Sequence, residues 1–363
     1  MSIIAVCLAA TAIVQCVKPE EEDTVQAYTI PHESAVHEGT WLVWPHAHTY
    51  GEDYAKSLEP IWIQMTQYLS TGEKVHIVAY DQSAQNYIEK VLHDAGVRMD
   101  QIEITIAKSD DVWARDTAGM FAYDPQGNPT ILDFGFDGWG KKTAYANDDK
   151  LPQCLAAQTG YTCTNMDEIV LEGGSVELDG MGTMMATRSS VISKNRNPEV
   201  SQEEMEQILS KYLGVTHFIW LDGVVDEDIT DAHIDGMARF FDDKTLVTVP
   251  EDDFFELYEG IKEEDYDALV TATNANGQAY KIVEIPLTKE NVKGLDYKGS
   301  YLNYYVANTV VLVPMYLDAN DELALNIIQG LYPDKEVVGI DVTPLYKHGG
   351  MLHCVTQQQP KMD

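Results

Sequence analysis

The sequence predicts an α/β fold, because short apolar runs typical of strands alternate along it with segments of helical spacing. With 363 residues the chain is long enough to bury a large hydrophobic core. No linker rich in Gly, Pro or Ser divides residues 27–363, so we expect them to form a single domain.

Strands and helices are expected in a definite order along this domain. Strands are predicted where apolar and β-branched residues cluster, at residues 74–80, 101–107, 216–221, 245–249, 281–287, 309–313 and 337–340. Helices are predicted where apolar residues have helical spacing, at residues 83–95, 201–213 and 321–331. The helix at 201–213 has the clearest start, because Ser201 is followed three residues later by Glu204, as in a capping box.

The chain is strongly acidic. Its 59 Asp and Glu residues outnumber its 24 Lys and Arg residues and give a formal net charge of -35 at pH 7. This balance argues against nucleic acid as a partner, since phosphate binding requires a basic surface. A negative field instead favours cationic substrates near a cleft, although solubility alone would also account for the charge.

Residues 1–26 have the composition of an export leader. Apolar and small residues extend from Ile3 to Cys16 and are followed by the acidic run at 20–23. The apolar run is too short to cross a bilayer as a helix and is similar to the hydrophobic region of a secretory signal. Cys16 before an acidic tether is also similar to a lipoprotein anchor. We therefore expect a periplasmic, lipid-anchored or secreted protein, with a cytoplasmic one as the alternative.

Three cysteines lie outside this leader. Cys154 and Cys163 are close enough in sequence to form a disulfide in an oxidising compartment, and whether they pair stays open. Cys354 is then the odd thiol and the candidate nucleophile, because Gly349 and Gly350 precede it and allow a sharp turn. A lone cysteine is more often a small buried hydrophobe, so other groups must converge on Cys354 before a function follows.

Polar groups interrupt the alternation in three further segments, beside glycines or at strand ends. Asp116 follows a predicted strand, Glu172 precedes two glycines, and His233 and Asp235 are separated by one residue. If the last pair lies on extended chain, both side chains leave the same face and suit a base beside a carboxylate that binds substrate. The structural alternatives are a salt bridge between Asp116 and its neighbouring arginine, a tight turn at Glu172 and a solvated acidic loop around His233.

No metal or organic cofactor is expected. His46 and His48 lack a third ligand at a recognised spacing, and the sequence contains no CxxC pair, HExxH motif or EF-hand spacing. It also contains no glycine-rich loop of the P-loop or dinucleotide-binding type.

A set of short motifs identifies a family resemblance. They lie, in order, at residues 37–45, 113–116, 133–140, 171–175, 195–198, 233–235, 301–308 and 353–360. Each motif is weak alone, but together they closely resemble the agmatine deiminase family, which is grouped with the Porphyromonas-type peptidylarginine deiminases. The resemblance covers essentially all of residues 28–360.

The resemblance implies a pentein fold, a five-fold pseudosymmetric α/β propeller with its active site in the central channel. It also implies hydrolysis of a guanidine through a covalent cysteine adduct, without a cofactor. Carried over to this chain, Cys354 is the nucleophile and His233 the general acid and base. Asp116 and Asp235 hold the guanidinium, and Glu172 is the acid associated with the histidine.

The substrate is expected to be a small cationic guanidine, with agmatine first. Trp44, Trp139, Asp137 and Asn303 are candidate pocket residues, although the two tryptophans could equally be core residues and Asn303 a structural cap. Asp137 stands where the family usually has Asn, so arginine in peptides remains open as the alternative substrate. Amidinotransfer and a catalytically silent pentein binding module are the alternative functions. Whether the chain forms a homo-oligomer stays open.

Overall fold

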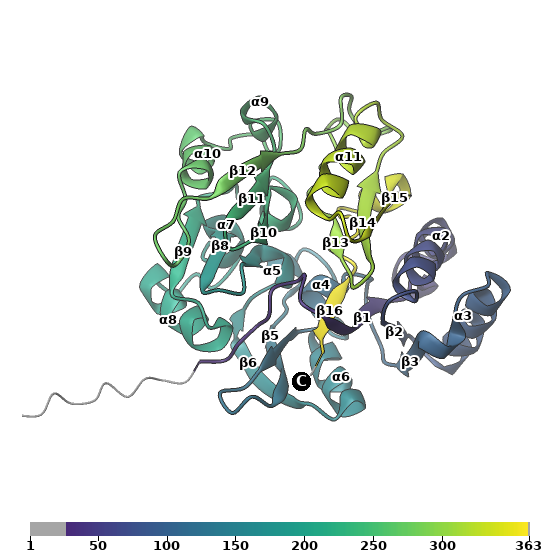
Figure 1. Ribbon diagram of the computed structural model, residues 1–363. Helices are drawn as coiled ribbons and strands as arrows, with labels where there is room; N and C mark the ends of the chain where they lie inside the picture. Colours follow the sequence, from purple (N-terminus) through teal and green to yellow (C-terminus); the bar gives the residue numbers. More distant parts are fainter. Residues whose placement is uncertain (1–26, 362–363) are drawn as a thin grey trace, which may run out of the picture.

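The computed structural model describes residues 27–361, so the predicted leader at 1–26 lies outside the described residues. Within residues 27–361 the strands form five separate sheets. Figure 1 shows these sheets around the segments that contain α4 (Ala114–Thr117) and α5 (Gly138–Lys141). The predicted α/β class is confirmed.

Each sheet repeats one internal pattern. An edge strand pairs antiparallel with a central strand, and the central strand pairs parallel with a strand that is reached through a helix. A parallel pair needs such a crossover, because the chain must return to the end where it began. Four of the sheets are β4 (Met120–Tyr123), β5 (Pro129–Gly135) and β6 (Thr162–Val170); β7 (Val176–Leu178), β8 (Thr183–Thr187) and β9 (His217–Leu221); β10 (Ala238–Asp242), β11 (Thr245–Thr248) and β12 (Lys281–Glu284); and β13 (Tyr305–Val306), β14 (Val310–Met315) and β15 (Glu336–Asp341).

The remaining sheet joins the two ends of the described chain. Its order is β16 (Gln357–Pro360), β1 (His37–Val43), β2 (Lys74–Ala79) and β3 (Ile102–Ile106). The last strand, β16, is the antiparallel edge strand beside β1, and the Trp41 indole N–H donates to the Gln359 side chain at 2.8 Å. The segment before β16 is therefore fixed against the start of the fold.

The crossover helices and the shorter helices complete the fold. The remaining α-helices are α1 (Ala47–Tyr50), α2 (Glu52–Leu69), α3 (Gln82–Asp94), α6 (Leu151–Thr159), α7 (Arg188–Val191), α8 (Gln202–Leu213), α9 (Glu251–Phe254), α10 (Glu263–Val270), α11 (Asp321–Leu331) and α12 (Thr343–Tyr346). Single 3-10 turns are η1 (Met99–Gln101), η2 (Asp148–Lys150), η3 (Gly173–Ser175) and η4 (Ile234–Gly236). Among the helices of the described chain, none combines the length and apolar character that crossing a bilayer requires.

Each predicted strand and helix has a counterpart, with shifts of a few residues at the ends. Helix α11 spans residues 321–331 as predicted, and Ser201 caps α8 in a capping box with Glu204. Helix α2 was not predicted. Pro60 lies inside it, and a proline normally argues against a helix interior. Cys154 and Cys163 are free thiols in the structure, so the disulfide that the sequence left open is not formed there.

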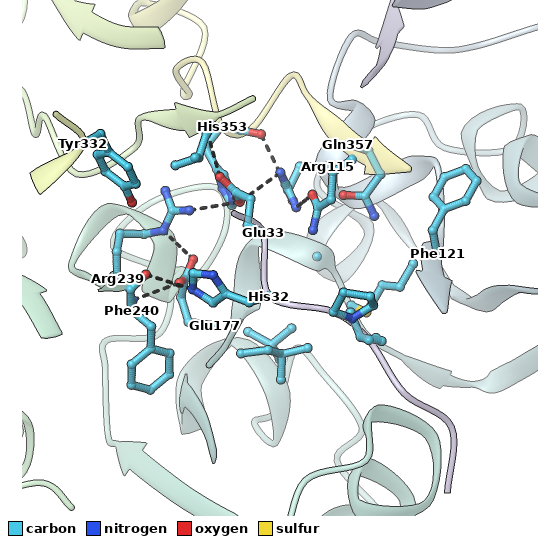
Figure 2. A pocket seen from close by; sticks show the side chains of 18 residues that line it. His32, Glu33, Arg115, Phe121, Glu177, Arg239, Phe240, Tyr332, His353 and Gln357 are labelled. Carbon is cyan, nitrogen blue, oxygen red and sulfur yellow. Dashed lines mark hydrogen bonds and ion pairs between the residues drawn. The ribbon is translucent and has the colours of Figure 1, made fainter. Parts of the chain in front are cut away.

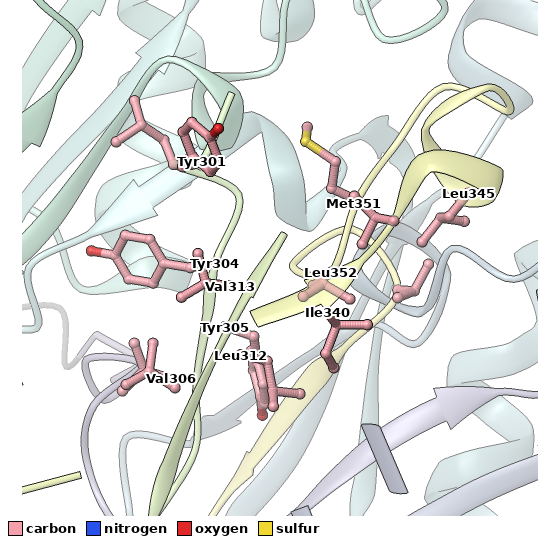
Figure 3. Close-up of a cluster of buried hydrophobic side chains, with 14 of the residues drawn as sticks. Tyr301, Tyr304, Tyr305, Val306, Leu312, Val313, Ile340, Leu345, Met351 and Leu352 are labelled. Atoms are coloured by element: carbon pink, nitrogen blue, oxygen red, sulfur yellow. The ribbon is translucent and has the colours of Figure 1, made fainter. Parts of the chain in front are cut away.

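The largest hydrophobic cluster anchors the loop that precedes β16. Met351 and Leu352 of this loop belong to the same buried cluster as Leu312 of β14 and Ile340 of β15 (Figure 3). Burying a leucine side chain fully contributes about 1.5–3 kcal/mol, and Leu352 is fully buried. The chain is therefore fixed two residues before Cys354.

Candidate active site

The polar residues singled out in the sequence occupy equivalent places in the five sheets. Each lies within five residues of the start of an antiparallel edge strand: Asp116 before β4, Glu172 before β7, His233 and Asp235 before β10, Asn303 before β13 and Cys354 before β16. Figure 1 shows the five sheets around a common centre. Contacts among the side chains of these segments show that they meet there. The site thus combines short segments that are far apart in sequence.

Cys354 is held in place by its backbone. The Asn303 side-chain oxygen Oδ1 accepts the backbone N–H groups of His353 at 3.0 Å and Cys354 at 3.3 Å. The Arg115 backbone N–H donates to the Cys354 carbonyl at 3.1 Å. The thiol Sγ is half-buried at 3.4 Å from Asn303 Oδ1 and 3.7 Å from Asp235 Oδ2. The thiol therefore lies directly beside a carboxylate.

Two buried carboxylates face the same centre. Asp116 accepts the Trp139 indole N–H at 3.0 Å and the Gly174 backbone N–H at 2.9 Å. Asp235 Oδ2 lies 2.7 Å from His353 Nδ1. Gly174 separates the two groups: a Cβ at this position would lie 3.1 Å from Asp116 Oδ1, 3.2 Å from Asp235 Oδ2 and 2.5 Å from His233 Nδ1. Only glycine lets these three side chains converge without displacement.

His233 lies between Asp116 and Glu172. Its Nδ1 is 4.0 Å from Asp116 Oδ2, and its Nε2 is 3.5 Å from Glu172 Oε2. The other oxygen of Glu172 accepts Arg196 Nε at 2.6 Å, and Arg196 Nη1 donates to Asp231 at 3.0 Å. Arg196, Glu172 and Asp231 are fully buried side chains. This ion network fixes the carboxylate that faces the imidazole.

The surrounding charges set the protonation states of the site. Burial acts to lower the pKa of His233, but the Asp116, Glu172 and Asp235 carboxylates outweigh it and raise this pKa to about 9. Burial and the Asp235 and Asp116 charges raise the pKa of Cys354 well above its usual value. At pH 7 these surroundings therefore favour an imidazolium and a neutral thiol.

The two carboxylates differ from each other. Burial, together with the Glu172 charge, raises the pKa of Asp116 despite the opposing effect of His233. Burial also acts to raise the pKa of Asp235, but the hydrogen bond and charge of His353 outweigh it, and this pKa lies below its usual value. Asp235 is thus the carboxylate whose ionised form is better stabilised.

Two details of the local geometry differ from the sequence expectations. His233 and Asp235 do not lie on extended chain: His233 caps η4 and Asp235 lies within this 3-10 turn. Both side chains nevertheless reach the same centre, because the turn brings them together. Asp116 lies in the one-turn helix α4, and its neighbour Arg115 pairs with Glu33 instead of Asp116.

The predicted pocket residues have different positions. Trp139 contacts Asp116 through its indole N–H and packs edge-on against Trp113, with ring centroids 6.5 Å apart. Trp44 is buried in the largest hydrophobic cluster, and Asp137 caps α5 by accepting the Gly140 N–H at 2.7 Å. Among the described residues, no hydrogen bond or ion pair joins Trp44 or Asp137 to the groups around the thiol. Their predicted contact with substrate stays a prediction.

Sequence reasoning missed the groups that support the site. Arg196 lies in a motif that carried the family resemblance, but its sequence position did not reveal its contact with Glu172. His353 and Glu33 form a further layer behind Asp235, where Figure 2 shows them with Arg115 and Arg239 around a cavity of about 50 Å³. A buried charge requires a partner, so buried carboxylates at the site imply that such partners exist. The sequence does not show which residues they are.

The arrangement suits chemistry on a planar cation. A guanidinium is planar and permanently charged, and its paired N–H groups match carboxylates at its edges. A thiol beside the two carboxylates can reach the central carbon, and an imidazolium nearby can supply a proton to a leaving amine. Among the residues described, these groups are brought together at this one centre.

Comparisons with known proteins agree with this geometry. The chain matches the family described as Porphyromonas-type peptidyl-arginine deiminase over residues 29–360. It is 29% identical to a putative agmatine deiminase of Latilactobacillus sakei over 357 residues, which cover 92% of this chain and 96% of that protein.

Solved structures show the same relationship. The agmatine deiminase of Enterococcus faecalis superposes with a TM-score of 0.82 at 28% identity, covering 93% of this chain and 97% of that one. The putative arginine deiminase from Porphyromonas gingivalis superposes with a TM-score of 0.81 at 32% identity, covering 92% and 98%. The resemblance read from the motifs is confirmed, and the chain belongs to the Porphyromonas-type peptidyl-arginine deiminase family.

Proposed function

We propose that the chain is an agmatine deiminase, a hydrolase that converts agmatine and water to N-carbamoylputrescine and ammonia through a covalent adduct on Cys354. The observation that carries the proposal is the convergence of Cys354, His233, Asp116 and Asp235 around Gly174. Similarity to agmatine deiminases over 92% or more of the chain supports the choice of guanidine.

Binding comes first and changes the state of the thiol. Asp116 and Asp235 hold the edges of the guanidinium and place its central carbon beside the thiol. Positioning of this kind can lower a barrier by about 7–11 kcal/mol at best. The bound cation offsets the carboxylate charges that raise the pKa of Cys354, so substrate binding favours release of the thiol proton to solvent and formation of the thiolate.

The first half of the reaction forms a carbon–sulfur bond. The thiolate attacks the central carbon and gives a tetrahedral intermediate. The His233 imidazolium gives its proton to one nitrogen, the carbon–nitrogen bond breaks, and ammonia leaves. The alkyl thiouronium remains on Cys354 and His233 is now neutral. Glu172, fixed by Arg196, orients the imidazole through this step.

The second half restores the enzyme. Neutral His233 takes a proton from water while the water oxygen attacks the same carbon. The carbon–sulfur bond then breaks, the hydroxyl proton of the intermediate is released to solvent as the ureido carbonyl forms, and Cys354 leaves as a thiolate. Once the cationic product has left, the thiolate takes a proton from solvent and the starting thiol is restored. No residue changes oxidation state, and one water is consumed for each ammonia released.

The charges around the site favour agmatine over free arginine. Agmatine carries two positive charges and no carboxylate, which suits a protein of net charge -35. The arginines nearest the site are already engaged by buried carboxylates: Arg115 and Arg239 by Glu33, and Arg196 by Glu172. They are therefore poorly available for a substrate carboxylate. Arginine within a peptide also lacks a free carboxylate and is the second candidate.

The proposal also includes the arrangement of the five sheets. We take the five sheets as the five modules of a pentein propeller, with the site in its central channel; their shared strand pattern supports this arrangement. Export, a lipid anchor on Cys16 and a homo-oligomer remain predictions.

The test is ammonia release by the full-length protein on agmatine, free arginine and an arginine-containing peptide, with Cys354→Ala as the control. We expect the highest kcat/KM with agmatine. A higher value with the peptide would instead make the protein a peptidylarginine deiminase. Absence of release from all three would contradict guanidine hydrolysis.

A further inference from the structure

A buried chain of alternating charges begins at Asp235, at the same oxygen that lies beside the thiol. His353 Nδ1 is 2.7 Å from Asp235 Oδ2, and His353 Nε2 is 2.7 Å from Glu33 Oε2. The same Glu33 oxygen lies 3.0 Å from Arg239 Nη2 and 3.5 Å from Arg115 Nη2. Figure 2 shows His353, Glu33, Arg239 and Arg115 at the wall of a cavity that the N-terminal segment also lines.

His353 has a carboxylate partner at each nitrogen of its ring. Both of its ring nitrogens lie at 2.7 Å from carboxylate oxygens, and an ionised carboxylate only accepts hydrogen bonds. Two ionised partners therefore require a proton on each nitrogen, which is the imidazolium form. If His353 were neutral, one of its nitrogens would face a carboxylate without a proton between them.

Both partners are held in the ionised form. Burial acts to raise the pKa of Glu33, but Arg239, His353 and Arg115 outweigh it and hold this pKa well below its usual value. The other oxygen of Glu33 accepts the Val306 backbone N–H at 3.0 Å. The pKa of Asp235 is also lowered, against burial, by His353.

We propose that His353 is a positioning residue, kept as an imidazolium by Glu33, that holds Asp235 ionised and aimed at the guanidinium. Glu33 precedes β1 and lies outside the motifs of the predicted site, so the proposal makes the N-terminal segment part of the catalytic arrangement. It rests on the proposed function for its kinetic consequence and on the two carboxylate contacts of the ring for the charge of His353.

Glu33 and Asp235 are the two carboxylates that contact the His353 ring, so the proposed charge of the ring depends on Glu33. Asp235 faces the ring from η4 and Glu33 from the N-terminal segment. Arg239 of β10 and Arg115 of α4 contact Glu33, and Arg115 also donates to the His353 carbonyl at 3.3 Å.

Two further groups are near but do not bond to the ring. Glu177 of β7 pairs with Arg239, and Cys354 is the next residue along the chain. Without the Glu33 charge, the two arginines disfavour an imidazolium. His353 then becomes neutral, and Asp235 is protonated at a higher pH.

The kinetic test is the pH profile of kcat/KM for agmatine in the full-length Glu33→Gln protein. Asp116 has the higher pKa of the two carboxylates and sets the acid limb in the wild type. In Glu33→Gln we expect this limb to move up and become steeper, with a loss of about tenfold on it, because Asp235 then takes up a proton in the same pH range; the alkaline limb should be unchanged. Glu33→Asp keeps the charge and should leave the limb near its wild-type position. Glu177→Gln is the matched control: a buried carboxylate on the same arginine, without contact to His353.

A spectroscopic test is independent of turnover. In protein labelled with ¹⁵N-histidine, the His353 signals, assigned with a His353→Asn variant, should show two protonated ring nitrogens at pH 7 in the wild type. They should show a neutral ring in Glu33→Gln.

A neutral ring in the wild type overturns the proposal, and so does an acid limb that does not move in Glu33→Gln. If Glu33→Gln does not fold, the proposal is tested by the wild-type spectrum, which should show two protonated ring nitrogens. It is also tested by the pH profile of Glu33→Asp, whose acid limb should stay near its wild-type position. If no guanidine is turned over, the proposed function fails while the spectrum still tests the charge of His353.

Discussion

Arg196 Nε lies 2.6 Å from one oxygen of Glu172, while the other oxygen of that carboxylate lies 3.5 Å from His233 Nε2. One fully buried carboxylate therefore links a structural guanidinium to the proposed acid and base. The stability of the core and the orientation of the imidazole depend on the same ion pair.

Replacing Arg196 with Gln should destabilise the protein strongly. It takes the guanidinium away from the buried Glu172 and leaves Asp231 with Lys142 as its cation, and breaking a buried pair in this way costs about 3–5 kcal/mol. Urea unfolding measures the free energy directly. Arg98→Gln, which breaks an exposed pair with Asp100, is the control and should change it by about 1 kcal/mol or less. Equal effects of the two substitutions would contradict the assigned network.

Gly174→Ala should impair turnover far more than it impairs folding. The added Cβ would lie 2.5 Å from His233 Nδ1, so the imidazole has to move. Misplacement by about 1 Å can lower a rate about a hundredfold. Gly236→Ala is the matched control, because a Cβ there meets nothing within 4 Å. Near-normal kcat in Gly174→Ala would show that His233 need not stay where the structure places it.

The stability of the wild-type protein should fall between pH 6.5 and pH 9 through His233. Its pKa is raised from 6.5 to about 9 in the folded state. The stabilisation is fully present below the unfolded value and is lost as pH rises through the folded one, with a slope of about 1.4 kcal/mol per pH unit. Chemical unfolding across this range should show the slope in the wild type and a shallower one in His233→Gln. Equal slopes would exclude the raised pKa.

Asp235→Asn should weaken both binding and rate. The substitution removes the charge that faces the guanidinium and lies 3.7 Å from the thiol, so we expect KM to rise and kcat to fall. Steady-state kinetics on agmatine measure both. Asp81→Asn is the comparison, because Asn also caps a helix well and the Asp81 cap of α3 takes no part in the contacts of the site, so kcat/KM should stay close to wild type. Unchanged KM and kcat in Asp235→Asn would remove Asp235 from the site.

Features that depend on a local sequence pattern could be predicted, and features that depend on tertiary packing could not. Helix α11 and the capping box at Ser201 are local patterns, and the sequence predicts both. Helix α2 contains Pro60 in its interior, and its buried Leu58, Trp62 and Met65 form the apolar face that outweighs the local cost of this proline.

The site residues also divide into those with a local sequence pattern and those that depend on long-range contacts. Cys354, His233, Asp116, Asp235 and Glu172 stand beside glycines or strand ends and could be singled out one by one. The common rule of their placement, just before the antiparallel edge strand of each sheet, depends on strand pairing that one sequence does not display. Glu33 and Arg196 act through long-range contacts, so local sequence gave no indication of their partners.

The covalent adduct is tested most directly by mass. Full-length protein is mixed with excess agmatine, quenched in acid during turnover and measured intact. We expect a species heavier than the free protein by the mass of agmatine less ammonia, located on Cys354 by peptide mapping and absent from Cys354→Ser. Turnover without this species, or turnover by Cys354→Ser at a rate near that of the wild type, would contradict a mechanism through Cys354.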